Sequence, residues 1–292
     1  MQMQAEDLRI YAEAYALWQD KAYLQAAKKI RGYLKNFLSS PEGAFYTSQD
    51  ADLVPGEHGA EYFQLNDAGR RQLGVPRIDM HVYALENGLA INALATVYSV
   101  TAEQDDLDDA IRAANWIIAH RAIPGGGFHH AEEDSGGPYL GDTLYMGRAF
   151  LALYTVTADR QWLGRAEEAM QFISADFRAD IGYLTSAGPA ELKWRPQVDE
   201  NVGVARWANL LHHYTGKAEY GQIAEPSRLT LRSGRTTFGN SAVPKIESGL
   251  VNQFWGLNSD RILQPLLRKV VLSPNSLPHG VFRCTDVPDL RP

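Results

Sequence analysis

The stretch LALYTVTADRQWLGRAEEAMQFI, residues 151–173, decides the fold, because it reads as one helical hairpin. An alanine- and leucine-rich helix carrying Tyr154 runs into a short polar turn, and an amphipathic helix follows it. Asp159 is placed to cap the second helix, since its carboxylate can accept hydrogen bonds from unpaired amides of the first turn. The local pattern therefore predicts two antiparallel helices.

Three further segments repeat this pattern, at residues 11–34, 95–118 and 210–231. The tyrosines near the ends of the first helices, Tyr15, Tyr98, Tyr154 and Tyr214, follow one another at steps of 83, 56 and 60 residues. Thr101 and Gln104 have the spacing of a capping box for the helix that runs through Trp116. Repeated helical hairpins predict an all-α fold in which the hairpins are stacked or closed into a ring. We assign residues 1–225 to this domain of helical hairpins and 226–292 to an irregular segment packed on it.

A second repeated element lies between the hairpins: EGAFYTSQDAD (42–52), GGGFHHAEED (125–134) and DIGYLTSAGP (180–189). Its aromatic residues Phe45, Phe128 and Tyr183 are separated by steps of 83 and 55 residues, which match the tyrosine steps. The glycines stand where an outer helix must stop and the chain must turn sharply. Glycine suits this position because it tolerates positive φ. Because no G-K-[ST] sequence follows, we do not expect a phosphate-binding loop.

Composition indicates an ordinary globular protein, with 45% hydrophobic and 22% charged residues. A net charge of -7 without a basic stripe argues against nucleic acid as a partner. Cys284 is the single cysteine, which excludes an intrachain disulfide and a multi-cysteine zinc site. We find neither a signal-peptide pattern nor an apolar run long enough to cross a membrane, so we expect a cytoplasmic protein without a membrane partner.

In a ring of hairpins the first helix of each pair lines the inside, and the loops before these helices gather at one end, the mouth. Polar residues of these segments are therefore the candidates for a site. For catalysis we select His81, Glu86, His129, Asp142 and Glu200, and for substrate binding Asp50, Asp52, Asn87, His130, Tyr139, Trp194 and Asn201.

Each candidate also has a structural interpretation. Aspartate at a helix start, such as Asp142, is expected as a cap without any function. His130 should point away from its neighbour His129 if the segment is extended. Histidine and acidic residues at 129–134 lack the helical spacing of a metal site, so we expect neither a metal ion nor a cofactor.

Four strings carry a resemblance to a known family: SPEGAFYTSQDADLVPGEHGAEYF, ENGLAINALATVY, YLGDTLYMGRAFLALYTVTADRQWLGRA and VDENVGVARWANLLHHYTGKAEY. Over roughly residues 5–225 the chain resembles the helical part of the YyaL-like, spermatogenesis-associated family of thioredoxin-domain proteins. That family is similar to the six-hairpin toroids, which include N-acylglucosamine 2-epimerase-like isomerases and several glycosidases. The resemblance implies a toroid that binds or converts a small carbohydrate in a loop-lined cavity.

Two departures from the family shape the functional expectation. The chain has neither the thioredoxin-like domain with its cysteine pair nor the HFEKMLYDNA-type segment, so we expect a fragment or shortened member with an incomplete ring. Its C-terminal segment or a second copy in a homo-oligomer would cover the exposed ring edges.

Two functions follow from these expectations. One is sugar epimerisation, isomerisation or glycoside hydrolysis, with His81 and His129 as the acid and base of an isomerase. The alternative is a non-catalytic binding or scaffold module that accompanies a thioredoxin-like domain or protein.

Overall fold

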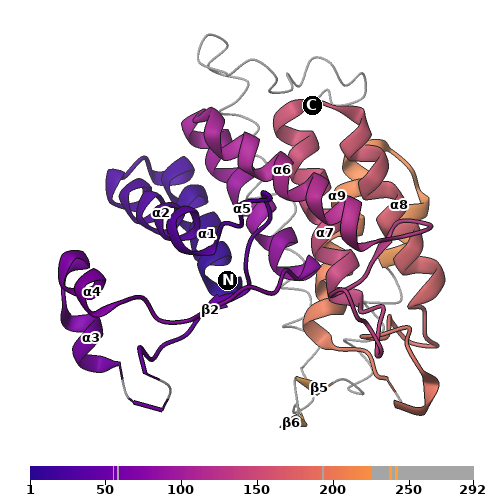
Figure 1. Ribbon diagram of the computed structural model, residues 1–292. Helices are drawn as coiled ribbons and strands as arrows, with labels where there is room; N and C mark the ends of the chain where they lie inside the picture. The colour runs from indigo at the N-terminus through magenta and orange to yellow at the C-terminus, as the bar shows by residue number, and fades with distance from the viewer. Residues whose placement is uncertain (55, 58, 193, 225–236, 239–240, 243–292) are drawn as a thin grey trace.

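The computed structural model describes residues 1–224, 237–238 and 241–242, except 55, 58 and 193, and the described chain is mostly helical (Figure 1). Three helical hairpins follow one another: α1 (Gln2–Trp18) with α2 (Lys21–Tyr33), α5 (Ala84–Thr101) with α6 (Gln104–Arg121), and α7 (Leu140–Thr157) with α8 (Arg160–Asp176). Helix α9 (Val198–Thr215) opens a fourth hairpin, whose second helix begins at residues 219–224. The predicted all-α fold is confirmed.

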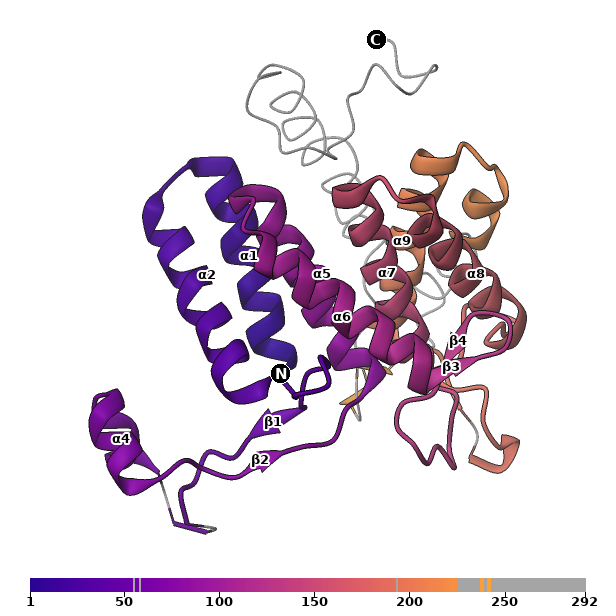
Figure 2. The ribbon, with the colours of Figure 1, turned by 45° about the horizontal axis from the view of Figure 1, so that its top comes forward.

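The hairpins form two layers. The first helices α1, α5, α7 and α9 pack on one another in this order, and α2, α6 and α8 cover them from outside (Figures 1 and 2). Helices α5 and α7 are buried around most of their circumference, whereas α6 and α8 bury one stripe, as expected for inner and outer helices. Glycines permit close approach, because a Cβ at Gly147 would lie 2.0 Å from the ring of Trp207 on α9.

The tips of the hairpins set the register of the repeat. Each inner helix ends on a left-handed residue, Gln19, Ala102, Ala158 or Gly216, whose N–H donates to the carbonyl four residues earlier. For the first three tips that carbonyl belongs to Tyr15, Tyr98 and Tyr154, which confirms the predicted alignment. In the fourth it belongs to His212, two residues before Tyr214. The alignment on Tyr214 was wrong because the turn geometry sets the register.

The starts of outer helices are only partly as predicted. Asp159 caps α8 by accepting from the N–H of Gln161 at 2.9 Å, as predicted. Thr101 does not complete a capping box, since its hydroxyl accepts from the N–H of Glu103 and Gln104 binds Asp108 instead. The physical reason is that Thr101 still belongs to α5, where its hydroxyl also donates to a backbone carbonyl.

The aromatic loops are held by the inner helices. Asn87 receives a hydrogen bond from the N–H of Phe45 and donates one to its carbonyl, and Asn201 does the same for Tyr183. The N–H of Phe128 donates to the hydroxyl of Thr143, at the same place in α7. Since all three aromatic side chains are buried, the repeated position anchors each loop to the ring.

Short antiparallel strand pairs, which the sequence did not predict, lie in the loops that precede the inner helices α5 and α7. β1 (Ser48–Gln49) pairs with β2 (Ile78–Asp79), and β3 (Ala122–Ile123) with β4 (Gly127–Phe128). Gly125 and Gly126 form the turn between β3 and β4 with φ of 94° and 103°, which explains the glycine run.

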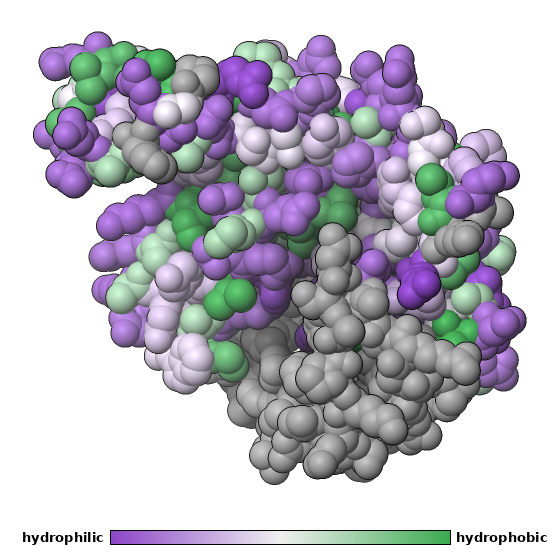
Figure 3. All heavy atoms as spheres, turned by 90° about the horizontal axis from the view of Figure 1, so that it is seen from below, coloured by the Kyte–Doolittle hydropathy of each residue, from purple (hydrophilic) through white to green (hydrophobic). Residues whose placement is uncertain are grey.

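Between β1 and β2 the chain leaves the ring as a projecting lobe with α3 (Ala60–Gln64) and α4 (Asp67–Leu73) (Figures 1 and 3). Of the predicted segment 226–292, the structure describes only β5 (Thr237–Phe238) and β6 (Ser241–Ala242), which pair with each other. The rest of that segment, including Cys284, lies outside the described residues. Within the described residues, no helix is long and apolar enough to cross a membrane.

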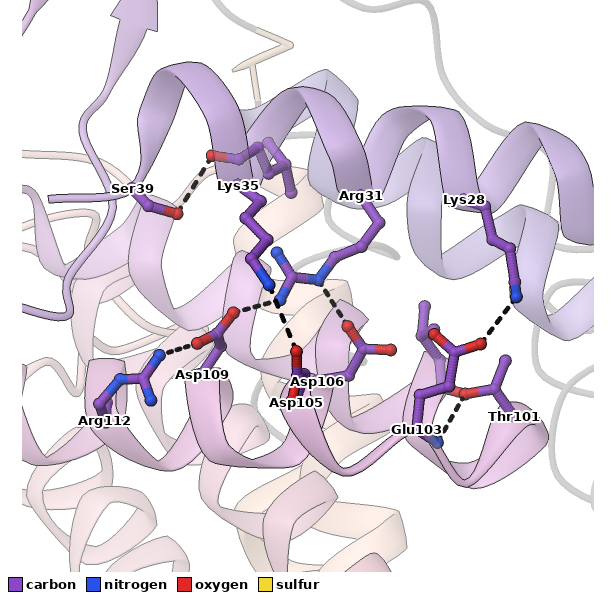
Figure 4. A network of polar contacts seen from close by, with 12 residues as sticks. Lys28, Arg31, Lys35, Ser39, Thr101, Glu103, Asp105, Asp106, Asp109 and Arg112 are labelled. Carbon is purple, nitrogen blue, oxygen red and sulfur yellow. Dashed lines mark hydrogen bonds and ion pairs between the residues drawn. The ribbon is translucent and has the colours of Figure 1, made fainter.

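A buried polar network joins two outer helices (Figure 4). Arg31 of α2 donates through Nε to Asp106 of α6 at 2.5 Å and also pairs with Asp109. Arg31 and Asp106 are 8% and 3% exposed, so this pair is shielded from water. Nearby, Lys28 bonds Glu103 at the surface.

Candidate functional site

The third residue of three successive inner helices is an acid: Glu86 in α5, Asp142 in α7 and Glu200 in α9. These helices start at the same end of the molecule, the lower end in Figure 1. None of the three helices has a side-chain cap of its own at the residue before its start. Each acid instead lies against the preceding inner helix, so the acids link neighbouring helix starts.

Asp142 is the most firmly held of the three. One of its oxygens accepts from the N–H of Leu85 at 2.8 Å, in the first turn of α5. Both oxygens lie near Nδ1 of His130, at 3.0 and 3.2 Å. Asp142 is 1% exposed, and burial raises the pKa of its carboxyl while the bonds from His130 and Leu85 oppose that shift. Asp142 therefore caps a neighbouring helix and orients a histidine.

His130 is half-buried at the loop end of the ring. Its hydrogen bond to Asp142 raises the pKa of the imidazole above its ordinary value. The carbonyl of His130 accepts from the N–H of Ala84, so backbone and side chain both bind around the start of α5. With Nδ1 directed at Asp142, Nε2 is the nitrogen left to exchange a proton with a ligand.

Glu200 is the second titratable group at this end. Burial raises the pKa of its carboxyl to about 7, although a hydrogen bond from Thr185 opposes the shift. Its Oε1 lies 3.6 Å from where a Cβ on Gly141 would stand, beside Asp142, and its Oε2 has no partner. Glu200 thus lies beside the first turn of α7, the same turn in which Asp142 binds His130.

Aromatic rings surround these groups. His130 stacks on Tyr83, with ring centres 4.2 Å apart, and meets Tyr139 edge to face at 5.9 Å. Tyr139 in turn packs edge to face on Trp194, whose indole N–H has no partner among the described residues. Such rings with unused donors can pack against the apolar face of a sugar ring and bind its hydroxyls. Tyr83 was not selected from the sequence.

The two histidines selected as an acid–base pair lie differently. His81 is exposed and pairs with Asp79. Its ring stacks on Tyr83, with ring centres 5.8 Å apart, so Tyr83 has stacking contacts with both His81 and His130. His129 is exposed and lies 3.4 Å from Asp134. The structure therefore brings His81 together with His130 through Tyr83 and leaves His129 outside the group.

The other selected residues are occupied by local structure. Asn87 and Asn201 are fully buried in the loop anchors described above, and Glu86 is 7% exposed and accepts from Gln2 at 2.8 Å. Asp50 and Asp52 accept backbone hydrogen bonds within the projecting lobe, from Asp52 and Gly59. The structure places neither aspartate in contact with the His130 group.

An open cleft of about 720 Å³ lies beside the stacked rings of His81 and Tyr83. Its wall includes His81, Tyr83, Trp116, Arg121 and Glu42. Tyr83 belongs both to this wall and to the stack with His130. The part of the chain that the structure describes holds no group of three or more His, Cys, Asp or Glu arranged for a metal ion.

No family model matches the chain, and no curated protein matches it in sequence. Its structure, however, is similar to solved structures of carbohydrate-active proteins. D-mannose isomerase matches with a TM-score of 0.61 and 13% identity, over 78% of this chain and 58% of that one. Cellobiose 2-epimerase from Bacillus thermoamylovorans B4167 matches with a TM-score of 0.58 and 15% identity, over 79% and 60%.

The family 76 α-mannanase BT2949 of Bacteroides thetaiotaomicron matches with a TM-score of 0.59 and 16% identity, over 79% of this chain and 60% of that one. The chain thus spans about 60% of the length of these structures. At such identities the likeness defines the fold alone, an (α/α) toroid.

Proposed function

We propose that this protein isomerises or epimerises a carbohydrate by proton transfer, with His130 and Glu200 as the proton-transferring groups. The observation that carries the proposal is the pair of titratable side chains at the first turn of α7. Isomerisation moves a proton to and from a carbon beside a carbonyl, and it needs groups whose pKa values lie near neutrality. His130, whose pKa the bond to Asp142 raises, and Glu200, whose pKa burial raises to about 7, meet that need.

The remaining residues have supporting roles in this proposal. Asp142 is a positioning residue, because it fixes the orientation and protonated nitrogen of His130 without facing the substrate. Tyr83, Tyr139 and Trp194 would form the apolar wall against the sugar ring. The names of the similar structures, a mannose isomerase and a cellobiose epimerase among them, support a sugar as substrate.

Glycoside hydrolysis is less well supported by the same geometry. It requires two carboxyl groups that both face the substrate, one protonated and one ionised. Asp142 is 1% exposed and bonded to His130 and Leu85, and Glu86 is bonded to Gln2. Glu86 and Glu200 each keep one carboxyl oxygen without a partner, but both of these oxygens are buried.

Membership of the YyaL-like family is part of the proposal and rests on the four sequence strings. A cytoplasmic location, self-association and the alternative of a thioredoxin-related scaffold remain predictions from the sequence. No contact in the described part of the chain favours the scaffold over the enzyme.

The test is exchange of carbon-bound sugar protons in deuterated water, followed by NMR over a panel of aldoses and ketoses. We expect exchange with at least one sugar, and a loss of about 10² to 10⁴-fold in His130→Gln and in Glu200→Gln. His129→Gln is the matched control, since its imidazole is adjacent in sequence but outside the group. Exchange that survives in His130→Gln, or none with any sugar from a folded sample, would refute the proposal.

A further inference from the structure

One repeat position is basic in three of the four inner helices. Counting ten residues back from the left-handed tips at 19, 102, 158 and 216 gives Arg9, Asn92, Arg148 and Arg206. Equivalent positions of neighbouring helices lie at one level of a ring of repeats. The inner layer therefore carries polar side chains at one height along the helices. We call this set, Arg9, Asn92, Arg148 and Arg206, the arginine level.

Arg148 lies on the face of α7 that the other helices leave free. Helices α5, α8 and α9 pack on α7, and the residues that they leave unburied in its middle form one stripe, Tyr145, Arg148, Ala152 and Thr155. Figure 2 shows α8 beside α7, and this stripe lies on the side of α7 that α5, α8 and α9 leave uncovered. Arg206 is exposed at the same level of α9.

The charges at this level are not balanced. Arg9 is neutralised on its own helix by Glu6 at 2.7 Å and Glu13 at 2.6 Å. Arg148 and Arg206 have no hydrogen bond or ion pair with any other described residue, and Arg148 lies over the ring of Tyr145 at 5.5 Å. Desolvation lowers the pKa of Arg148; the fields of Tyr145 and Glu6 oppose this shift, and those of Arg9 and Arg206 add to it. A partly desolvated cation without a carboxylate is unfavourable unless an anion joins it.

The arginine level lies within reach of the proton-transferring groups. Arg206 follows Glu200 by six residues, about 9 Å along the helix axis. Side chains on a helix tilt towards its N-terminus, and the contact of Arg148 with Tyr145, one turn earlier, has this direction. Tyr145, over whose ring Arg148 lies, is also within the field of Glu200, so the arginine level borders the end of the helices where Glu200 lies.

We propose that the substrate is an anionic sugar, whose carboxylate or phosphate binds Arg148 and Arg206 while its carbonyl end meets His130 and Glu200. This inference rests on the proposed function and specifies its substrate class. Guanidinium groups suit the task, because their N–H groups pair with carboxylate or phosphate oxygens in a fixed planar geometry. Asn92 adds an uncharged amide at the same level of α5.

The experiment is calorimetric titration of the protein at low salt with glucose, glucuronate, glucose 6-phosphate and inorganic phosphate, alongside the exchange assay on the three sugars. We expect glucuronate or glucose 6-phosphate to bind at least about 10-fold more tightly than glucose, as a charge-assisted hydrogen bond provides. Arg148→Gln and Arg206→Gln should each abolish most of that preference. Arg165→Gln, an exposed arginine of the outer helix α8, changes the net charge equally and should leave the preference intact.

The outcomes separate this inference from the proposed function. Glucose that binds and exchanges as well as the charged sugars would overturn the anionic substrate while the isomerase stands. Inorganic phosphate that binds as tightly as glucose 6-phosphate, or a preference that persists in both arginine variants, would also overturn it. Arginine-dependent binding of a charged sugar without exchange would support the anion site and refute the isomerase. Unfolding temperatures identify a misfolded variant, and Arg206, being exposed, provides the safer one.

Discussion

Two buried aspartates of this protein are bonded to basic side chains, with different consequences. Asp106 binds Arg31 between the outer helices α2 and α6, and Asp142 binds His130 at the loop end of the inner helices (Figure 4 shows the first pair). Both aspartates are at most 3% exposed. The partners differ, because arginine stays charged at every accessible pH whereas histidine changes its charge near neutrality.

Accessibility separates the pairs further. The side chain of Arg31 is 10% exposed, and that of His130 is 33% exposed. A permanently charged, enclosed pair can hold two helices together but cannot move a proton. A titratable pair with an open side can do both, so burial of the acid alone does not identify a functional site.

The largest effect on stability should come from Arg31→Met. The change leaves Asp106 without its cation in a shielded place, while Asp109 keeps Arg112, and removal of one partner of a buried ion pair costs about 3–5 kcal/mol. Urea unfolding followed by circular dichroism measures the difference. A loss below about 1 kcal/mol would mean that the network of Figure 4 does not hold the outer layer.

Asp142→Asn should show whether Asp142 acts on His130 or only stabilises the fold. The remaining carbonyl oxygen still accepts from Leu85, so we expect a modest loss of stability, about 1 kcal/mol. Activity should fall by about 100-fold, within the range of general acid–base catalysis. Since the bond to Asp142 raises the pKa of His130, the residual rate should rise with pH at a lower pH than in the wild type. An unshifted profile would assign Asp142 a purely structural role.

Glu200→Gln should change the dependence of stability on pH. Burial raises the pKa of Glu200 in the folded state to about 7, so the folded protein retains a proton that the unfolded chain loses above its ordinary pKa of 4.5. Wild-type stability therefore declines between pH 4.5 and 7 through this group.

At pH 8 the glutamine variant should then be more stable than the wild type by about 1–2 kcal/mol, after allowance for solvent screening, with little difference at pH 4. Urea unfolding at both pH values measures this. Equal differences at the two pH values would contradict the shifted pKa.

The smallest effect should come from Lys28→Met, in the surface pair beside Arg31. Lys28 and Glu103 are each about half exposed, and such pairs contribute about 0–1 kcal/mol. Thermal unfolding at low and high salt measures it. A loss as large as that of Arg31→Met would show that burial is not what distinguishes the two contacts.

Much of the fold could be predicted because short-range sequence patterns specify each repeat. The hairpin turns and the cap at Asp159 depend on residues close together in the chain, and the glycine turn at 125–126 depends on backbone conformation alone. Tyr214 misled the alignment because a tyrosine near the helix end is a weaker constraint than the left-handed tip, which Gly216 marks.

The arrangement of the site was harder to predict, because it depends on contacts between repeats. Alternation along an extended segment predicts that His129 and His130 diverge, but it does not say which one faces the ring. Asp142 and Tyr83, from two other segments, select His130. The signal that the sequence did contain is the acid shared by Glu86, Asp142 and Glu200 at the third position of each inner helix.

The most direct test of the central claim is an NMR titration of the histidine side chains in the wild type and in Asp142→Asn. If His130 is the proton-transferring group that Asp142 orients, its pKa lies above that of an ordinary histidine in the wild type and falls in the variant. A His130 that titrates like an ordinary exposed histidine, with the same pKa in both proteins, would contradict the account.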